Sequence, residues 1–219
     1  MYSFAKTVLY LGLLAGLGAC QAPRAIPASK LLGYFRPAAP ADTLRFEIAE
    51  TGADAPVEGD TIPNQLFFTA LDAALLREID YVADSAMAVV FGKQRFPIDD
   101  DFDACLVDIR QFWFQHQSLL LYDKRKRAFT GRVTVAEWYG GDGGQVLTGS
   151  WMLDRNGDGS KDLVRREIQH TLLPDENGDM RDITHESAMQ LIWKETRFVE
   201  QPLSDTALVV KQFPIRSFW

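Results

Sequence analysis

Residues 145–173 read QVLTGSWML, DRNGDGSKD and LVRREIQHTLL in succession, two apolar-rich runs joined by nine polar residues. The outer runs contain many β-branched and aromatic side chains, which pack well on a pleated sheet. Asn156-Gly157, near the centre, is a dipeptide typical of tight type I′ turns. The stretch therefore predicts two antiparallel strands joined by a hairpin.

The chain before this hairpin continues the same pattern. Short β-prone runs recur from Ala86 onward, separated by turn residues such as GGDGG: AMAVVF, CLVDIRQFWF, SLLLY and AFTGRVTVAEWY. Such spacing predicts an antiparallel meander. After the hairpin, ESAMQLIWKETRF fits both helix and strand periodicity and we favour a strand, while ALVVKQF before Pro214 predicts a last strand.

One segment carries a helical pattern instead. Phe67, Leu71, Leu75 and Ile79 recur every four residues without an intervening proline, and Asn64 stands where a helix N-cap is expected. We predict a helix over residues 65–79. The fold class is therefore mainly β, an antiparallel meander with calcium-loop hairpins and one early helix, with α+β as the alternative.

The first twenty residues differ from the rest of the chain. Lys6 is followed by the apolar run TVLYLGLLAGLGA and then by Cys20, an arrangement typical of a secretory signal peptide. Leu17-Gly18-Ala19-Cys20 resembles the lipobox of bacterial lipoproteins. The resemblance implies cleavage before Cys20 and acylation of that cysteine with palmitate-like chains. A plain secretory signal cut near Ala19 is the alternative.

The resemblance also bears on localisation. Gln21 follows Cys20, where enteric bacteria place an aspartate to keep a lipoprotein at the inner membrane, so a lipid anchor in the outer membrane is implied for a Gram-negative host. Two or three acyl chains, at about 0.8 kcal/mol per buried methylene, anchor a protein without any transmembrane helix. We expect a cell-envelope lipoprotein.

The domain division follows from composition. Residues 1–19 are the predicted signal peptide, and residues 20–43 hold four of the ten prolines with many alanines, which predicts an extended tether. LLGYF within the tether is expected to dock on the domain. Leu44, Phe46 and Ile48 alternate with charged residues and predict a first strand, so residues 44–219 form one globular domain.

Charge and cysteine content exclude some functions. The formal net charge is −7, and it becomes −8 if cleavage of the signal peptide removes residues 1–19, which include Lys6. An acidic chain disfavours a nucleic-acid partner and suits cations. If Cys20 is acylated, Cys105 is the one cysteine left, so no internal disulfide forms, and Cys105 in ACLVDI is expected to be a small buried residue.

The nine residues DRNGDGSKD carry the clearest chemical signal. Calcium takes six to eight oxygen ligands, and this loop places an oxygen-bearing side chain at every second position with Gly159 at the bend. The pattern D-x-N-x-D-G-x-x-D resembles the loop shared by EF-hands, dockerins and the calcium hairpins of FG-GAP-type β repeats. The resemblance implies side-chain ligands and one backbone carbonyl, from Asp154, Asn156, Asp158, Asp162 and the carbonyl of Ser160.

Two departures decide which of these relatives the loop is closest to. The twelfth position, where an EF-hand has a bidentate glutamate, is Arg165, which cannot ligate a cation. The flanking runs are β-prone and not helical. We therefore interpret the loop as a strand-flanked, stabilising calcium site.

A second loop repeats part of the pattern. Residues 175–182 read DENGDMRD, with Met180 in place of the glycine. If residues 163–173 form one strand, the two loops lie at opposite ends of the sheet and act as two independent sites. A simple turn at Asn177-Gly178 is the alternative for this loop. The candidate ligands are Asp175, Asn177, Asp179, Asp182 and Glu186.

Two charged clusters complete the candidates. Asp99, Asp101 and Asp103 alternate without a following glycine, and we interpret them as a solvated acidic loop and not as a third metal site. The basic quartet, Lys124, Arg125, Lys126 and Arg127, stands at an expected hairpin tip. A charged turn is the favoured interpretation, and contact with anionic lipid or an envelope protein is the alternative.

No signature of catalysis is found. His116, His170 and His185 have no metal-ligand spacing, and the chain has no HExxH, CxxC or Gly-x-Ser-x-Gly motif. The expected function is that of a calcium-binding envelope lipoprotein with a structural or binding role, and we do not expect an enzyme. The alternative is a calcium-stabilised envelope hydrolase whose active site these motifs do not reveal.

Overall fold

The structure is a computed structural model that describes residues 28–39, 41–48, 58–77, 87–111, 114–141 and 143–216. The predicted signal peptide, Cys20 and the first part of the predicted tether lie outside the described residues. So does Ile79 at the end of the predicted helix. The predictions made for these segments stay predictions.

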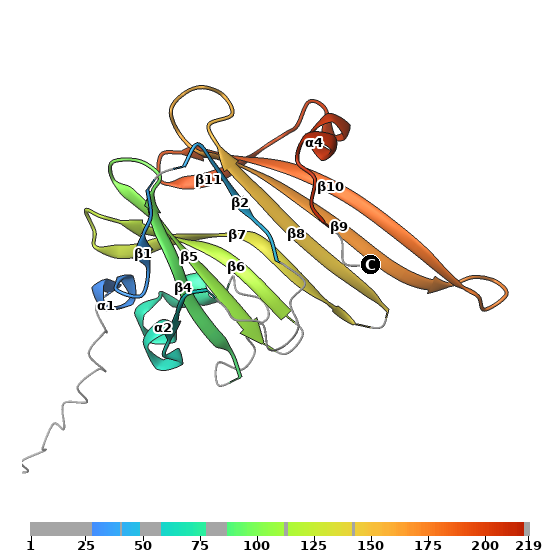
Figure 1. The fold of residues 1–219 in the computed structure, drawn as a ribbon, viewed down its shortest axis with the longest axis horizontal. Helices are drawn as coiled ribbons and strands as arrows, with labels where there is room; N and C mark the ends of the chain where they lie inside the picture. Colours follow the sequence, from blue (N-terminus) through green and yellow to red (C-terminus); the bar gives the residue numbers. More distant parts are fainter. Residues whose placement is uncertain are drawn as a thin grey trace, which may run out of the picture.

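One large mixed sheet forms the molecule (Figure 1). Its last eight strands follow one another in chain order, and each is antiparallel to the next: β4 (Val89–Pro97), β5 (Phe102–Gln111), β6 (Phe114–Asp123), β7 (Ala128–Gly141), β8 (Gly144–Leu153), β9 (Asp162–Pro174), β10 (Met180–Lys194) and β11 (Arg197–Gln201). The prediction of a mainly β fold built as an antiparallel meander is confirmed.

Three short strands and four short helices complete the described chain. β1 (Arg36–Pro37) pairs parallel with β4, and β3 (Asp60–Ile62) pairs antiparallel with it. β2 (Thr43–Phe46) pairs with β8, as expected of the predicted first strand, and lies in front of it in Figure 1. The helices are α1 (Ala28–Leu32), α2 (Asn64–Ala70), α3 (Ala73–Arg77) and α4 (Thr206–Gln212).

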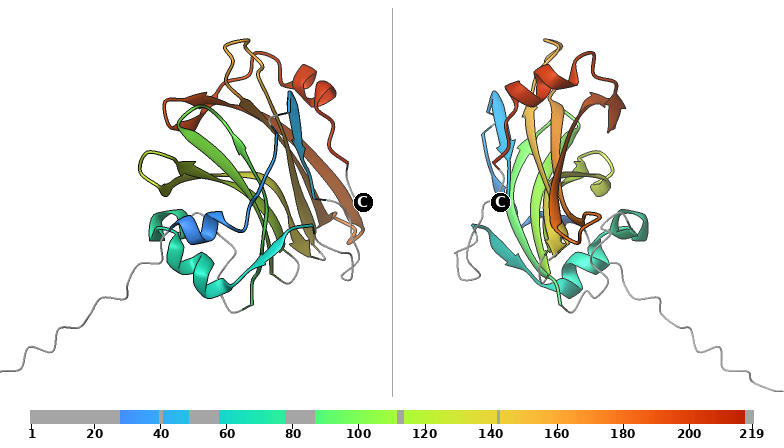
Figure 2. Two further views of the ribbon diagram at one scale, coloured as in Figure 1. Left: turned by 60° about the vertical axis from the view of Figure 1, so that its left-hand side comes forward. Right: turned by 90° about the vertical axis from the view of Figure 1, so that its right-hand side faces the viewer.

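The sheet is strongly curved, so its early and late strands face each other (Figure 2). The rings of Phe102 at the start of β5 and Trp193 near the end of β10 meet edge to face, with centroids 5.4 Å apart. An apolar core fills the space between the two halves and includes Leu119, Met152 and Leu163. Burial of these side chains drives the curvature, because it removes apolar surface from water.

A second core lies on the opposite face of β5 and β6, where α1, α2 and α3 pack. It joins Cys105 and Leu120 of the sheet to Leu31, Phe35 and Phe67 of the N-terminal segments. The predicted docking of LLGYF is therefore confirmed, since Leu31 and Phe35 are buried. The folded part begins by Ala28, earlier than the predicted boundary at residue 44.

The predicted helix over residues 65–79 is interrupted. Phe67, Leu71 and Leu75 are buried as expected, but the backbone at Leu71 is extended and separates α2 from α3. Asp72 restarts the chain as a helix, because its carboxylate accepts a 2.7 Å bond from the Ala74 amide. The predicted cap at Asn64 is wrong, since its side chain donates instead to the Ala88 carbonyl at 2.7 Å.

The prediction of a last strand in ALVVKQF is also wrong. These residues form α4, which begins after Asp205 because that carboxylate accepts a 2.9 Å bond from the Leu208 amide. Val209 is buried against the sheet and Leu208 is exposed. Val-rich composition favours a strand locally, but the cap and packing on one face favour a helix. The favoured strand in ESAMQLIWKETRF is confirmed as parts of β10 and β11.

Within the described residues, no helix is long and apolar enough to span a membrane.

Candidate metal centre

The first loop joins β8 to β9, so its predicted strand flanks are confirmed. Leu153 and Asp162 pair as the last rung of the ladder, and the loop leaves the sheet between them. The predicted type I′ turns are wrong: they need positive φ at Asn156 and Asn177, but Arg127 and Glu195 are the non-glycine described residues with that conformation.

Asp154 shapes the first loop through its backbone contacts. Its two carboxylate oxygens accept hydrogen bonds from the amides of Gly157 at 2.7 Å and Gly159 at 2.9 Å. Both glycines have positive φ, 77° and 86°, which explains why glycine occurs there. A carboxylate has about four lone-pair sites, so Asp154 can accept these bonds and still ligate a cation.

The middle of the loop is exposed and held by its own side chains. Asn156 donates from Nδ2 to Asp158 Oδ2 at 2.8 Å, and Asp158 Oδ1 accepts from the Ser160 amide at 2.7 Å. These bonds, that of the Ser160 amide first, lower the pKa of Asp158. Asp158 is therefore a carboxylate at neutral pH, as a calcium ligand must be.

Asp162 differs from the other candidate ligands because it is buried, with 1 % of its surface exposed. Its Oδ1 accepts a 3.3 Å bond from the Trp193 amide, and its Oδ2 has no hydrogen-bond partner within the described chain. Burial raises the pKa of Asp162, and the charges of Asp158 and Asp154 raise it further. A buried carboxylate oxygen without a donor is costly, and a bound cation would remove that cost.

The candidate carboxylate ligands of the first loop do not surround one common point. Among the described residues, no three carboxylate, histidine or cysteine side chains converge closely enough to hold a metal ion. The residues nevertheless fit a hard cation, because Asp162 Oδ2 accepts no hydrogen bond from any described residue and lies within the field of Asp154 and Asp158. The full predicted ligand set is Asp154, Asn156, Asp158, Asp162 and the carbonyl of Ser160.

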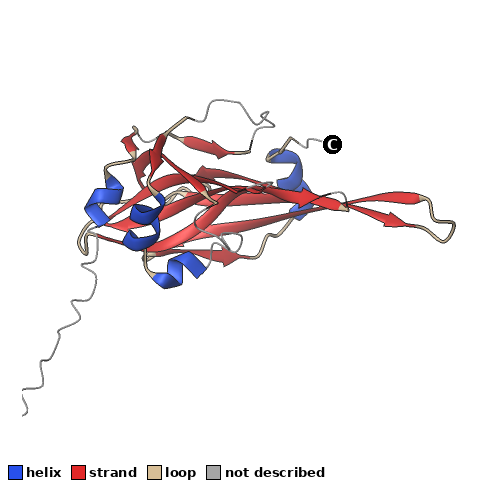
Figure 3. Ribbon diagram, turned by 90° about the horizontal axis from the view of Figure 1, so that it is seen from below, coloured by secondary structure: helices blue, strands red, loops and turns tan. Residues whose placement is uncertain are grey.

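The second loop lies at the other end of β9, as predicted, at the tip of a ribbon that β9 and β10 extend away from the rest of the sheet (Figure 3). Asp175 Oδ1 accepts from the amides of Asn177 at 2.8 Å and Asp179 at 3.0 Å. Its Oδ2 contacts Arg181 at 3.4 Å. The guanidinium of Arg181 therefore already pairs with the Asp175 carboxylate.

The structure does not bring the remaining predicted ligands to the second loop. Asp182 pairs with His170 Nε2 at 2.8 Å, and Glu186 pairs with Arg166. Glu186 lies opposite Ile168 in the ladder, six residues from Met180 and therefore about 20 Å along the strand. The prediction that Glu186 completes this loop is wrong, because an extended strand carries it away.

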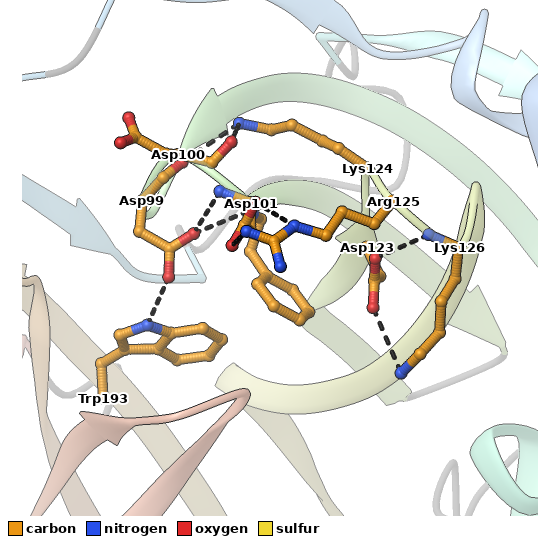
Figure 4. A network of polar contacts seen from close by, with 9 residues as sticks. Asp99, Asp100, Asp101, Asp123, Lys124, Arg125, Lys126 and Trp193 are labelled. Atoms are coloured by element: carbon orange, nitrogen blue, oxygen red, sulfur yellow. Dashed lines mark hydrogen bonds and ion pairs between the residues drawn. The ribbon is translucent and has the colours of Figure 1, made fainter.

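The acidic loop lies beside the basic quartet, and Figure 4 shows Asp99–Asp101 together with Lys124, Arg125 and Lys126. Arg125 contacts Asp101 at 2.6 Å, and Lys124 contacts Asp103 at 3.1 Å. Lys126 pairs with the buried Asp123 at 3.2 Å. Three of the four cations thus have carboxylate partners within the chain, which leaves less charge for anionic lipid.

A third polar cluster lies on β6 and β7. The sequence contains no local signal for this cluster, because its members come from two different strands. His116 on β6 contacts Glu137 on β7 through Nδ1 at 3.1 Å and Ser118 Oγ through Nε2 at 2.6 Å. Arg132 donates from Nη1 to His116 Nε2 at 3.0 Å and to Ser118 Oγ at 2.9 Å. The order of serine, histidine and carboxylate is that of an activated nucleophile, but Ser118 is fully buried.

No protein-family model, curated protein or solved structure matches this chain. Any function must therefore be argued from its own residues.

Proposed function

We propose that this chain is a calcium-binding lipoprotein of the cell envelope, in which the first loop holds one structural calcium ion. The buried Asp162 Oδ2 carries the proposal, because no described residue donates a hydrogen bond to it. Asp154, Asn156 and Asp158 supply further oxygens, and the ion supplies the positive charge that balances these carboxylates. The lipobox resemblance at Leu17–Cys20 supports the lipid anchor and the outer-membrane location.

The ion has a structural role in this proposal. It joins the end of β8 to the start of β9, and Asp162 extends the link to β10 through the Trp193 amide. At ten times its dissociation constant, calcium stabilises the fold by about 1.4 kcal/mol. The chain is then a binding or structural component of the envelope whose fold depends partly on extracellular calcium.

Calcium titration with thermal melting tests the metal site. We expect saturating calcium to raise the melting temperature of the full chain by roughly 3 to 6 °C relative to chelator. Asp162→Asn should lose this shift, and Asp175→Asn in the second loop should keep it. An equal melting temperature in calcium and chelator contradicts the proposal, and loss of the shift only in Asp175→Asn moves the site to the second loop.

Acylation is tested separately in bacterial cells. A palmitate analogue should label the wild-type chain but not Cys20→Ala, and only the wild type should sediment with membranes. Labelling of neither protein contradicts the anchor and favours the plain secretory signal.

A hydrolase is the second candidate function, favoured by the hydrogen bonds that link Glu137 to His116 and His116 to Ser118. A fluorophosphonate probe, which reacts with activated serines, distinguishes the two. Because Ser118 is fully buried, we expect no labelling of the folded chain. Labelling that Ser118→Ala abolishes would favour the hydrolase.

A further inference from the structure

A groove of about 670 Å³ opens where the sheet does not close on itself. β7 pairs with β8 only from Glu137 onward, so residues 130–134 of β7 border the opening on one side. β9, β10 and β11 border it on the other side through Arg165, Leu191 and Phe198. The groove therefore lies between the two halves of the curved sheet.

The floor of the groove is apolar. Leu121 belongs to the core between the two halves, and Val133, Leu191 and Phe198 are half-buried against that core. They leave apolar surface accessible at the opening, where a hydrocarbon chain would displace water.

The rim of the groove is cationic. Its lining contains three arginines, Arg132, Arg165 and Arg197, and no aspartate or glutamate among the described residues. Arg132 is held in place by bonds from Nη1 to Ser118 and to Thr134 at 3.1 Å. Arg165 and Arg197 form no ion pair or side-chain hydrogen bond with any described residue. In a chain of net charge −7, this local cationic rim is complementary to an anion.

We propose that this groove binds a single-chain amphiphile with a carboxylate head, a ligand of the fatty-acid class. Guanidinium groups bind carboxylates with paired, charge-assisted hydrogen bonds, which suits Arg165 and Arg197. The tail lies on Val133, Leu191 and Phe198. The volume falls within the usual range for small-ligand sites. An inorganic anion would leave the apolar floor exposed to water, and a cationic amphiphile would face the arginines.

Titration calorimetry of the full chain tests this site with dodecanoate as the probe. Acetate has the same head without the tail, and dodecyltrimethylammonium has the same tail with a cationic head. We expect dodecanoate to bind at least about ten-fold more tightly than either. Equal affinity for acetate or for dodecyltrimethylammonium would overturn the proposal.

Two charge-matched double variants complete the test. Arg165→Gln with Arg197→Gln should weaken dodecanoate binding at least about ten-fold, because both remove a charged hydrogen-bond donor. Arg127→Gln with Lys211→Gln removes two exposed cations elsewhere and should leave the affinity unchanged. Melting temperatures verify that both variants fold. Unchanged affinity in the first variant, or an equal loss in both, would overturn the proposal, whatever the outcome at the calcium loop.

Discussion

The indole Nε1 of Trp193 donates a 2.9 Å hydrogen bond to Oδ2 of Asp99, and these residues are 94 positions apart in the sequence. The backbone amide of Trp193 also donates to Asp162 at the base of the first loop. Asp99 in turn accepts from the Phe102 amide at 2.7 Å (Figure 4). Trp193 therefore connects the candidate metal centre to the turn between β4 and β5, across the curved sheet.

The first prediction tests this connection. Trp193→Phe keeps the aromatic contacts with Phe102 and Phe198 but removes the donor to Asp99. We expect a loss of about 1 to 2 kcal/mol of unfolding free energy, since the acceptor is a partly exposed carboxylate. Urea unfolding measures it. Trp138→Phe is the control, because its 3.3 Å bond to Gln145 spans only seven residues. An equal loss in both variants contradicts the connection.

The second prediction concerns pH without calcium. The pKa of Asp162 is raised above 3.8, mainly by burial, so the folded chain binds this proton more tightly than the unfolded chain. The contribution of Asp162 to stability therefore falls as pH rises from 3.8 through the raised value. Asp162→Asn avoids the buried charge and should melt no lower than the parent at neutral pH in chelator. A lower melting temperature in chelator contradicts this assignment.

The third prediction separates backbone strain from packing at Gly159. An added Cβ there would meet no atom within 4 Å, but φ is +86°. Gly159→Ala should therefore cost about 1 to 2 kcal/mol through conformation alone. Gly141→Ala, equally open and without positive φ, should change stability by less than about 0.5 kcal/mol. Thermal unfolding compares them, and a neutral Gly159→Ala would show that the loop relaxes.

The fourth prediction concerns Arg166, which is buried under α4. It donates to the carbonyls of Val210 at 2.6 Å and Phe213 at 2.9 Å, near the C-terminal end of that helix. Arg166→Met leaves these carbonyls without a donor, so we expect a loss of about 2 to 4 kcal/mol in urea unfolding. Lys211→Met on the exposed side of α4 is the control and should change stability by under about 0.5 kcal/mol. A loss under about 1 kcal/mol in Arg166→Met would show that water replaces the guanidinium.

The strands of the meander were predictable because each has a local cause. Runs such as SLLLY and QVLTGSWML are short, apolar and bounded by turn residues, and the structure places them in β6 and β8. The helix near Phe67 was also predictable from a local pattern, because Phe67, Leu71 and Leu75 recur every four residues. Its break at Leu71 was not predictable. Periodicity reports which face is buried and says little about where the backbone bends.

Other features depend on partners distant in sequence. ALVVKQF becomes α4 because Arg166 of β9 donates hydrogen bonds to its carbonyls and because Asp205 caps the start of the helix. The cluster of His116, Ser118 and Arg132 and the cationic groove likewise need strands from different parts of the chain. No local pattern reveals such assemblies, because strand pairing and curvature place their members together.

The first loop has some features that neighbouring residues determine and others that depend on the tertiary structure. The sequence by itself determined the order of its oxygens, its glycines and its strand flanks, since turn formation depends on neighbouring residues. Only the tertiary structure decided that Asp162 is buried, with one oxygen bound to the Trp193 amide and the other without a donor among the described residues. The reason is physical: burial and electrostatic fields depend on the whole fold, and the pairing of β10 with β9 brings the Trp193 amide to Asp162 at the start of β9.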